Sequence, residues 1–302
     1  MSKFIAPHHW EQEKVNAYFH SQSAYWEDIY ASSGVYAEIH RNRRRVVLDW
    51  IDNLALAPGS QVLEVGCGAG FMAVELAQRG FHVHAIDPVE AMIELARRHA
   101  AESGTSALLS LDIGDACSLS FENASFDLIL AIGVIPWLEQ PELAIQEMAR
   151  VTKPGGHSIL TADNRARLNH LLDPWLNPAL FPLKLRVKAL LERIGLRQPA
   201  PATFSSTFHD CHYIDEVLSR AGLVKIRDMT LGFGPFTLHN SRIIPEPFST
   251  ALHYRLQRLA DLNMPGFRST GAQYIVLAKK SSSQPLVQLA SSEGHVSNAT
   301  TV

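Results

Sequence analysis

The sequence of 302 residues has few cysteines, no long apolar run and no large excess of charge of one sign. Its three cysteines, Cys67, Cys117 and Cys211, form no C-x-x-C pair. That count argues against a disulfide framework and a structural zinc site, and favours a reducing cytoplasm. A formal net charge of -3 provides no broad basic field for nucleic acid phosphates. We therefore expect a small molecule, and no nucleic acid, as the partner.

Membrane-spanning and targeting signals are also missing. No window approaches the roughly 18 uninterrupted apolar residues of a membrane span. The first residues, MSKFIAPHHWEQEK, lack the apolar core of a signal peptide. We expect neither secretion nor insertion into a membrane, and a hydrophobic content of 46% is enough for a full globular core. The sequence does not predict an oligomeric state.

Short β-branched runs alternate with longer helical periods from about residue 60. This alternation is typical of an α/β fold with a doubly wound sheet whose two faces are covered by helices. The expected strands are QVLEVG, HVHAID, ALLSLDIG, DLILAIG, HSILTAD, KIRDMTL and AQYIVLAKK. A helix is expected at DEVLSRAGL, and two others are expected from the helical spacing of Met92, Leu95, Ala96 and His99 and of Ile145, Met148, Ala149 and Thr152. A turn at residues 153–156, Lys-Pro-Gly-Gly, would end the last of these helices.

The composition divides the chain into three parts. Residues 1–54 predict a helical cap that packs on the sheet or over a ligand site, and residues 55–280 predict the main domain. Within that domain, residues 165–205 differ in character, since Pro174, Pro178 and Pro182 interrupt an apolar and basic segment. We expect a helical lid there, with peripheral membrane contact through residues 170–196 as an alternative. Residues 281–302 are rich in small polar residues and predict a disordered tail.

A glycine-rich turn, Gly66-Cys67-Gly68-Ala69-Gly70, follows the first expected strand. Glycines permit a sharp turn, close approach of backbone to a ligand, and tight helix packing. The turn alone is weak evidence, because it is equally consistent with a flexible loop. Asp87 ends the next strand about 20 residues later, where a carboxylate can bind ribose hydroxyls, although a strand-end aspartate is often just a helix cap. The joint spacing favours a nucleoside site.

Two observations distinguish between cofactors. The pattern is G-x-G-x-G with Glu64 inside the strand, whereas dinucleotide sites use G-x-G-x-x-G. Four segments, VLEVGCGAG, AIDPVEAMIELAR, GDACSLSFENASFDLIL and MARVTKPGG, resemble the successive motifs of class I S-adenosylmethionine-dependent methyltransferases, closest to the UbiE/UbiG-like small-molecule group. The resemblance covers residues 55–165. It implies a Rossmann-like sheet of seven strands, mostly parallel with the last strand antiparallel.

The resemblance also implies site residues. Glu64, Gly66 and Gly68 would surround the aminocarboxypropyl part of S-adenosylmethionine, and Asp87 would bind its ribose. The adenine would lie near Pro88 and Met92, with Asp115 bound to its amino group and Ala116 beside the ring. Ile132 and Gly133 would form the floor near the sulfonium. Cys67 and Gly70 complete the expected set of cofactor-binding residues. For Met92 and Ile132, plain core packing is an equal alternative.

The acceptor side is less clearly marked. Trp137 follows the fourth strand, at the edge where ligand crevices open, and is expected to contact the substrate or to pack at a helix start. His209 is our first candidate for a general base and His212 the second, with Tyr213 and His239 as substrate contacts. In the alternative interpretation Asp210 caps a helix and both histidines lie on the surface. Three ligands within four residues suit magnesium poorly, so we predict no metal.

The basic run at residues 41–45 would bind an anionic group or form a solvated helix face.

The predicted function is methyl transfer from S-adenosylmethionine to a small molecule, with a hydroxyl of a quinone precursor, lipid-linked sugar or secondary metabolite as the acceptor. The alternatives are a protein that binds S-adenosylmethionine without catalysis and a nicotinamide-dependent oxidoreductase. The segments 170–200 and 232–264 match no motif, and we expect them to carry specificity.

Overall fold

The computed structural model describes residues 12–193, 206–238 and 241–282. The helices are α1 (Gln12–Ser21), α2 (Ser23–Asp28), α3 (Val35–Asp52), α4 (Phe71–Gln78), α5 (Glu90–Glu102), α6 (Pro141–Val151), α7 (Leu168–Leu172), α8 (Phe181–Arg193), α9 (Cys211–Arg220) and α10 (Glu246–Asp261). Short 3-10 helices are η1 (Ser106–Leu108), η2 (Ile135–Trp137) and η3 (Pro178–Leu180). The strands are β1 (Gln61–Val65), β2 (His82–Asp87), β3 (Leu109–Ile113), β4 (Phe126–Ala131), β5 (Thr152–Asn164), β6 (Phe208–His209), β7 (Leu223–Leu231), β8 (Thr237–Leu238), β9 (Ser241–Arg242) and β10 (Gln273–Lys280).

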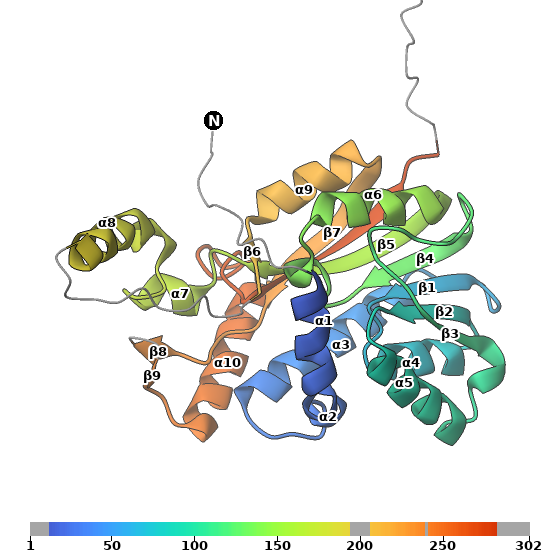
Figure 1. Cartoon of the computed structure of the whole chain (residues 1–302), viewed down its shortest axis with the longest axis horizontal. Helices are drawn as coiled ribbons and strands as arrows, with labels where there is room; N and C mark the ends of the chain where they lie inside the picture. The colour runs from blue at the N-terminus through green and yellow to red at the C-terminus, as the bar shows by residue number, and fades with distance from the viewer. Residues whose placement is uncertain (1–11, 194–205, 239–240, 283–302) are drawn as a thin grey trace, which may run out of the picture.

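One central sheet organises the chain, with the strand order β3-β2-β1-β4-β5-β10-β7 (Figure 1). Strands β1 to β5 run parallel, and β10 runs antiparallel to both β5 and β7. The two-residue strand β6 pairs with β5 and adds an eighth strand that the sequence did not predict. The expected doubly wound α/β sheet with an antiparallel last strand is confirmed.

Both faces of the sheet are buried because alternate residues of each strand enter different clusters. On one face, Leu128 and Leu130 of β4 pack with side chains of α3, α4 and α5. On the other face, Ile129 and Ala131 pack with side chains of α6 and α9. Figure 1 shows the two helix layers on opposite sides of the sheet. A strand buried on both sides must be apolar throughout, which is why these strands read as continuous hydrophobic runs.

Local details differ from the sequence predictions. The segment 153–156 was expected to form a turn, but it belongs to the irregular start of β5, where Phe126 pairs with Thr152 and Leu128 already pairs with His157. The intervening residues bulge out of register, and Gly155 accommodates this with a φ of 78°. The α6 helix does end before this segment, at Val151. Strand β3 begins at Leu109, because η1 occupies the residues just before it.

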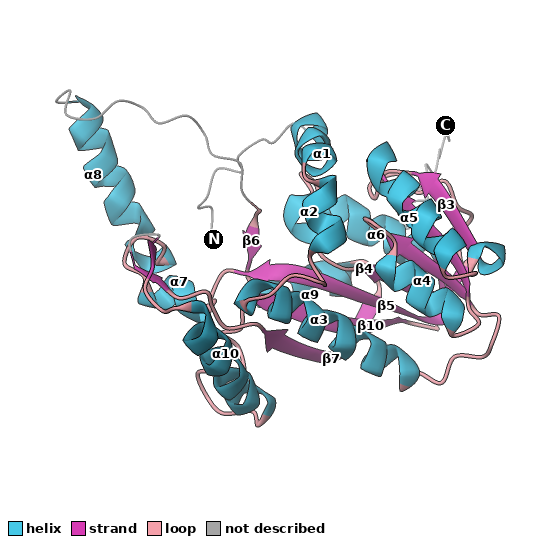
Figure 2. Ribbon diagram, turned by 90° about the horizontal axis from the view of Figure 1, so that it is seen from below, coloured by secondary structure: helices cyan, strands magenta, loops and turns pink. Residues whose placement is uncertain are grey.

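The segments at the edges of the sheet have distinct positions. Helices α1, α2 and α3 occupy the N-terminal part, and α3 packs along the sheet. In the segment expected to form a lid, α8 stands away from the body at one end of the molecule (Figure 2), whereas Leu168 of α7 packs against the cluster that contains Phe233 and Phe236. Of the predicted tail, only Ser281 and Ser282 lie within the described residues. Among the residues that the structure describes, no helix has both the length and the apolar character needed to cross a membrane.

The central strand β4 provides a test of this packing. Ile129 has no exposed surface, so we expect Ile129→Ala to lower the free energy of unfolding by about 2–5 kcal/mol through lost burial and the cavity left behind. Ile226 on β7 is 52% exposed, and Ile226→Ala should cost less than about 1 kcal/mol. Urea unfolding of both variants measures the difference. Equal losses would show that β4 is not in the core.

Candidate functional site

The sheet order reverses between β1 and β4, which start connections in opposite directions. In doubly wound folds such a switch point leaves a crevice beyond the carboxyl ends of the strands. Here the crevice is a cavity of about 810 Å³. The strand ends and the loops that follow them contribute Gly66, Asp87, Asp115, Gly133 and Asp163 to its wall. Helices α1, α2 and α3 contribute the opposite wall.

The three glycines of the turn after β1 have separate structural roles. Gly66 has a φ of 68°, and a Cβ there would lie 2.4 Å from Cγ2 of Val134. At Gly70, the N-cap of α4, a Cβ would lie 2.6 Å from the Cβ of Ala96 on α5. Gly68 has a φ of 52°, and no heavy atom lies within 4 Å of its Cβ position. Gly66 and Gly70 are therefore required by packing, whereas Gly68 leaves open space in the cavity wall.

Asp87 connects the ends of β1 and β2. Its Oδ2 accepts a hydrogen bond from the Gly68 N–H (2.9 Å), and its Oδ1 accepts one from the Val89 N–H (3.0 Å). The side chain is 8% exposed, and burial raises its pKa above the ordinary value. Asp87 therefore fixes the glycine turn and the residues that lead into α5 while also lining the cavity.

Glu64 lies inside β1 beneath the turn. It is 4% exposed, and its Oε2 has no hydrogen-bond partner. Burial and the nearby Asp87 raise the pKa of Glu64 to about 8, so the carboxyl group is mostly protonated at neutral pH. Burial likewise raises the pKa of the Cys67 thiol well above its ordinary value. The wall of the cavity at this point therefore carries less negative charge than its residue types suggest.

The residues expected around an adenine lie together. Pro88, Met92, Asp115 and Ala116 all line the cavity. Met92 is 2% exposed and packs in a cluster with Ala69, Val89 and Leu95. The Oδ1 atom of Asp115 accepts a hydrogen bond from the Cys117 N–H (2.9 Å), which sets the carboxylate at the start of its loop.

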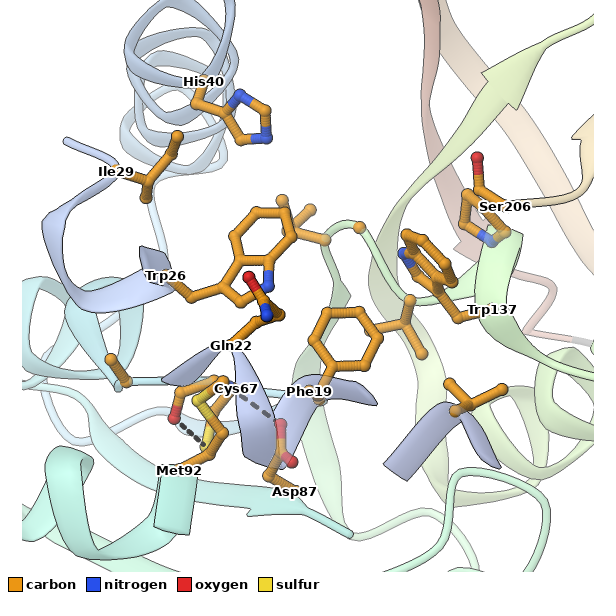
Figure 3. A pocket seen from close by; sticks show the side chains of 18 of the residues that line it. Phe19, Gln22, Trp26, Ile29, His40, Cys67, Asp87, Met92, Trp137 and Ser206 are labelled. Atoms are coloured by element: carbon orange, nitrogen blue, oxygen red, sulfur yellow. Dashed lines mark hydrogen bonds between the residues drawn. The ribbon is translucent and has the colours of Figure 1, made fainter. Parts of the chain in front are cut away.

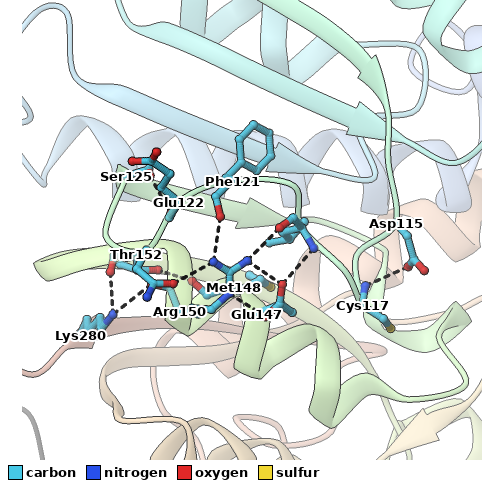
Figure 4. Close-up of polar contacts among 12 residues, drawn as sticks. Asp115, Cys117, Phe121, Glu122, Ser125, Glu147, Met148, Arg150, Thr152 and Lys280 are labelled. Atoms are coloured by element: carbon cyan, nitrogen blue, oxygen red, sulfur yellow. Dashed lines mark hydrogen bonds and ion pairs between the residues drawn. The ribbon is translucent and has the colours of Figure 1, made fainter.

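Arg150 of α6 holds that loop in shape (Figure 4). Its guanidinium donates to the carbonyl oxygens of Leu119 and Phe121, each at 2.8 Å, and pairs with Glu147. Glu147 in turn accepts a hydrogen bond from the Leu119 N–H at 3.0 Å. The loop between β3 and β4, which carries Asp115, is therefore fixed from a helix outside the cavity.

Aromatic side chains of the N-terminal helices cover the glycine turn. Figure 3 shows Phe19, Gln22 and Trp26 lying over Cys67, Met92 and Asp87. On the other side of the cavity, the ring of Trp137 stacks on Tyr18 at 5.9 Å and meets Phe19 edge-on at 5.1 Å. Trp137, Ile132 and Gly133 all line the cavity, as expected from the sequence.

The basic run 41–45 separates into three side-chain contacts outside the cavity and one cavity residue, Arg43. Arg41 pairs with Glu38, Arg44 pairs with Glu75, and Arg45 donates to Asn42. Arg43 is 7% exposed, and its Nη1 would lie 3.1 Å from a Cβ at Gly133. Within the described part of the chain its guanidinium forms no hydrogen bond or ion pair, and its Nε is buried. Arg43 therefore lines the cavity, whereas Arg41, Arg44 and Arg45 form their contacts outside it.

A histidine that the sequence did not single out also lines the cavity. His40 is 3% exposed, and its Nδ1 lies 2.9 Å from the carbonyl oxygen of Tyr36. Burial and the nearby Arg43 lower the pKa of His40 to about 3, so the ring is neutral. The carbonyl holds the proton on Nδ1, which leaves Nε2 as a hydrogen-bond acceptor. Tyr36, His40 and Arg43 share one face of α3, and this helical spacing was the signal in the sequence.

The structure does not bring the candidate bases to the cavity. His209 is buried in β6 and its ring stacks on Tyr213 at 5.6 Å, while burial lowers its pKa. His212 is exposed on α9, where its backbone N–H donates to the capping carboxylate of Asp210 (2.9 Å). The hydroxyl of Tyr213 donates to Glu142. Asp210 is therefore a helix cap, and none of His209, His212 and Tyr213 lines the cavity. His239 lies outside the described residues.

Within residues 12–193, 206–238 and 241–282, no group of three or more His, Cys, Asp or Glu side chains is arranged to hold a metal ion.

The chain is similar to known methyltransferases. Residues 63–160 match a family described as a methyltransferase domain. Ubiquinone biosynthesis O-methyltransferases of Hahella chejuensis and Paracidovorax citrulli are 37% and 34% identical over 118 residues. Each match covers 39% of this chain and 49% or 50% of the relative. The chain thus spans about half the length of the curated relatives it matches.

Solved structures share the fold. Magnesium protoporphyrin IX methyltransferase from Synechocystis PCC 6803 with bound SAH has a TM-score of 0.60 at 19% identity, covering 89% of this chain and 99% of that one. The cyclase SpnF has a TM-score of 0.58 at 17% identity, covering 90% and 97%. The domain match, the relatives and the fold agree with the geometry of the glycine turn. Residues 63–160 are thus similar to a methyltransferase domain, and the chain shares the fold of a solved methyltransferase.

Proposed function

We propose that this protein transfers a methyl group from S-adenosylmethionine to an oxygen of a small-molecule acceptor in the cytoplasm. The observation that carries the proposal is one cavity that joins the nucleoside side, at Gly68 and Asp87, to a second side beyond Gly133. The relatives named for ubiquinone biosynthesis favour a hydroxyl of a quinone precursor as the acceptor. A cavity of about 810 Å³ has room for both reactants.

The chain's residues would bind and align the reactants. Asp87 would accept hydrogen bonds from the ribose hydroxyls, and the open backbone at Gly68 would let the cofactor approach. Met92 and Asp115 would hold the adenine. Bound S-adenosylmethionine supplies an electrophilic methyl group on its sulfonium. The aromatic cover from Phe19, Trp26 and Trp137 would exclude water from that group.

The alternative of a binding protein without catalysis has a direct test. The likeness to SpnF shows a shared fold alone, so methyl transfer must be measured separately from cofactor binding. Transfer of a labelled methyl group to hydroxylated aromatic acceptors supports the proposal. Tight cofactor binding with no transfer to any acceptor favours the alternative, whereas binding of NADH instead of S-adenosylmethionine contradicts the proposal altogether.

Asp87 provides a first prediction. Asp87→Ala removes two hydrogen bonds that shape the turn and the expected ribose acceptor. We expect the affinity for S-adenosylmethionine, measured by calorimetry, to fall about 10- to 100-fold. Asp112→Ala is the matched control, because Asp112 is exposed on β3 and does not line the cavity. Unchanged affinity in the Asp87 variant would rule out the proposed site.

Glu64 provides a second prediction. Its pKa of about 8 in the empty site should fall when a cationic cofactor binds, because a nearby positive charge favours the carboxylate. Binding below about pH 8 should therefore release close to one proton, and affinity should rise up to about tenfold per pH unit until pH 8. Calorimetry in buffers of different ionisation enthalpy measures this release. In Glu64→Gln the proton released by this group should disappear, and its persistence would refute the role of Glu64.

We also propose that α7 and α8 contact an anionic lipid surface. Their segment exposes nine large apolar side chains: Leu171, Leu172, Trp175, Leu180, Phe181, Leu183, Leu185, Val187 and Leu190. Arg186 and Arg193 are exposed on α8 and would face acidic headgroups.

Vesicle sedimentation tests this contact. The protein should sediment with phosphatidylglycerol vesicles and much less with phosphatidylcholine, because the basic side chains require anionic headgroups. The double variant Leu183→Glu with Leu190→Glu should lose most of this binding. The control Val224→Glu with Ile226→Glu, on the exposed face of β7, should retain it. Equal loss in both double variants would contradict a contact specific to α8.

A further inference from the structure

Beyond Gly133 the cavity has a polar far side, formed by two segments distant in sequence. Helix α3 contributes Tyr36, His40 and Arg43, while the end of β5 and the loop after it contribute Asp163 and Arg167. The rings of Tyr36 and His40 lie 4.4 Å apart, and the guanidinium of Arg167 lies 3.5 Å from the carboxylate of Asp163. The proposed cofactor residues leave this side free for the acceptor.

The guanidinium of Arg167 is held rigidly. Its Nε donates to the carbonyl oxygen of Asn164 at 3.1 Å, and its Cζ lies 4.4 Å from the ring centre of Phe208. The side chain is 14% exposed, yet Nη2 is buried without a hydrogen bond to any described residue and lies 3.5 Å from the carboxylate of Asp163. A stacked guanidinium with unused donors is prepared to bind a planar oxyanion.

Arg167 keeps unused hydrogen-bond donors because Asp163, the carboxylate beside it, also accepts a hydrogen bond from Ser206. The Oδ2 atom of Asp163, which faces Arg167, already accepts a hydrogen bond of 2.6 Å from the Ser206 hydroxyl. Burial lowers the pKa of Arg167 despite the nearby carboxylate. Asp163, which lies 3.5 Å away and is shared with Ser206, is the carboxylate that pairs with Arg167 in the described part of the chain.

The charges on the far side do not balance. Among the described residues there, the guanidinium groups of Arg43 and Arg167 face the single carboxylate of Asp163, since His40 is neutral. S-adenosylmethionine does not correct this excess, because its sulfonium and ammonium outweigh its one carboxylate and make it a cation. Uncompensated buried charge is costly. The remaining negative charge must come from the other reactant.

We infer that the methyl acceptor is an anion that carries a carboxylate, and that Arg167 binds this carboxylate. A planar group with one negative charge matches the guanidinium fork and the single excess charge, whereas a doubly charged phosphate would be repelled more strongly by Asp163. The inference rests on the proposed function and narrows its substrate class. It also gives a role to the segment after β5, which the sequence comparison with the methyltransferase domain does not reach.

Binding to the SAH-loaded full chain tests the inference without requiring catalysis. The probes are para-hydroxybenzoate and para-hydroxybenzamide, which have nearly the same shape and differ in charge. Calorimetry should show the carboxylate binding at least about tenfold more tightly than the amide. Arg167→Gln should abolish this preference, and Arg167→Lys should restore only part of it, because lysine keeps the charge and loses the fork. Arg255→Gln, an exposed arginine on α10 outside the cavity, should leave it unchanged.

The outcomes separate this inference from the proposed function. Failure of the unaltered protein to bind SAH or S-adenosylmethionine overturns the proposed function. Normal SAH binding with equal affinity for the two probes overturns the inference alone. Normal SAH affinity of Arg167→Gln shows that the variant is folded. If this folded variant retains the preference for the carboxylate, the inference is likewise overturned.

Discussion

The hydrogen bond from the Gly68 N–H to the carboxylate of Asp87 is the interaction on which the site depends. It joins two parallel strands just beyond the point where their own ladder ends, and so holds the glycine turn open toward the cavity. Gly66 and Gly70 permit this conformation by leaving space for Val134 and for Ala96. The conformation of the turn, the direction of α4 and the position of the carboxylate therefore depend on one another.

The central sheet was predictable because its physical signal is local. Strands such as β4 are buried on both sides, so their sequences are continuous apolar runs that end at Gly or Asp. The cofactor side was predictable for a related reason, since its residues follow directly after those strands. Asp163 has the same strand-end position as Asp87, and the same logic would have singled it out.

The acceptor side was not predictable, because it depends on side chains from elements far apart in sequence. The spacing of His40 with Tyr36 and Arg43 places it on one face of a helix but does not show that this face lines the cavity, and His209 is instead buried against Tyr213. Helix α10 was missed for another reason. Its buried face carries Ser249, His253 and Gln257, and the latter two accept hydrogen bonds from the backbone N–H groups of Phe233 and Gly232. A helix whose inner face is polar lacks the hydrophobic periodicity that marks helices in sequences.

The two sides of the cavity also differ in how their charges are satisfied. Near the turn, Glu64 avoids an unpaired charge by remaining protonated, whereas arginines on the far side cannot neutralise themselves in this way. In the protein without ligands, buried charge therefore costs less free energy on the side of Glu64 than on the side of the two arginines.

The guanidinium of Arg150 touches no residue of the cavity wall that we assign to a ligand, yet it fixes the loop that carries Asp115. In a mutational screen, a change at Arg150 would resemble a defect in purine recognition. Under the proposed role of Asp115, discrimination between nucleobases would depend partly on a helix on the opposite side of the loop, and evolution could tune it without altering a single contact residue.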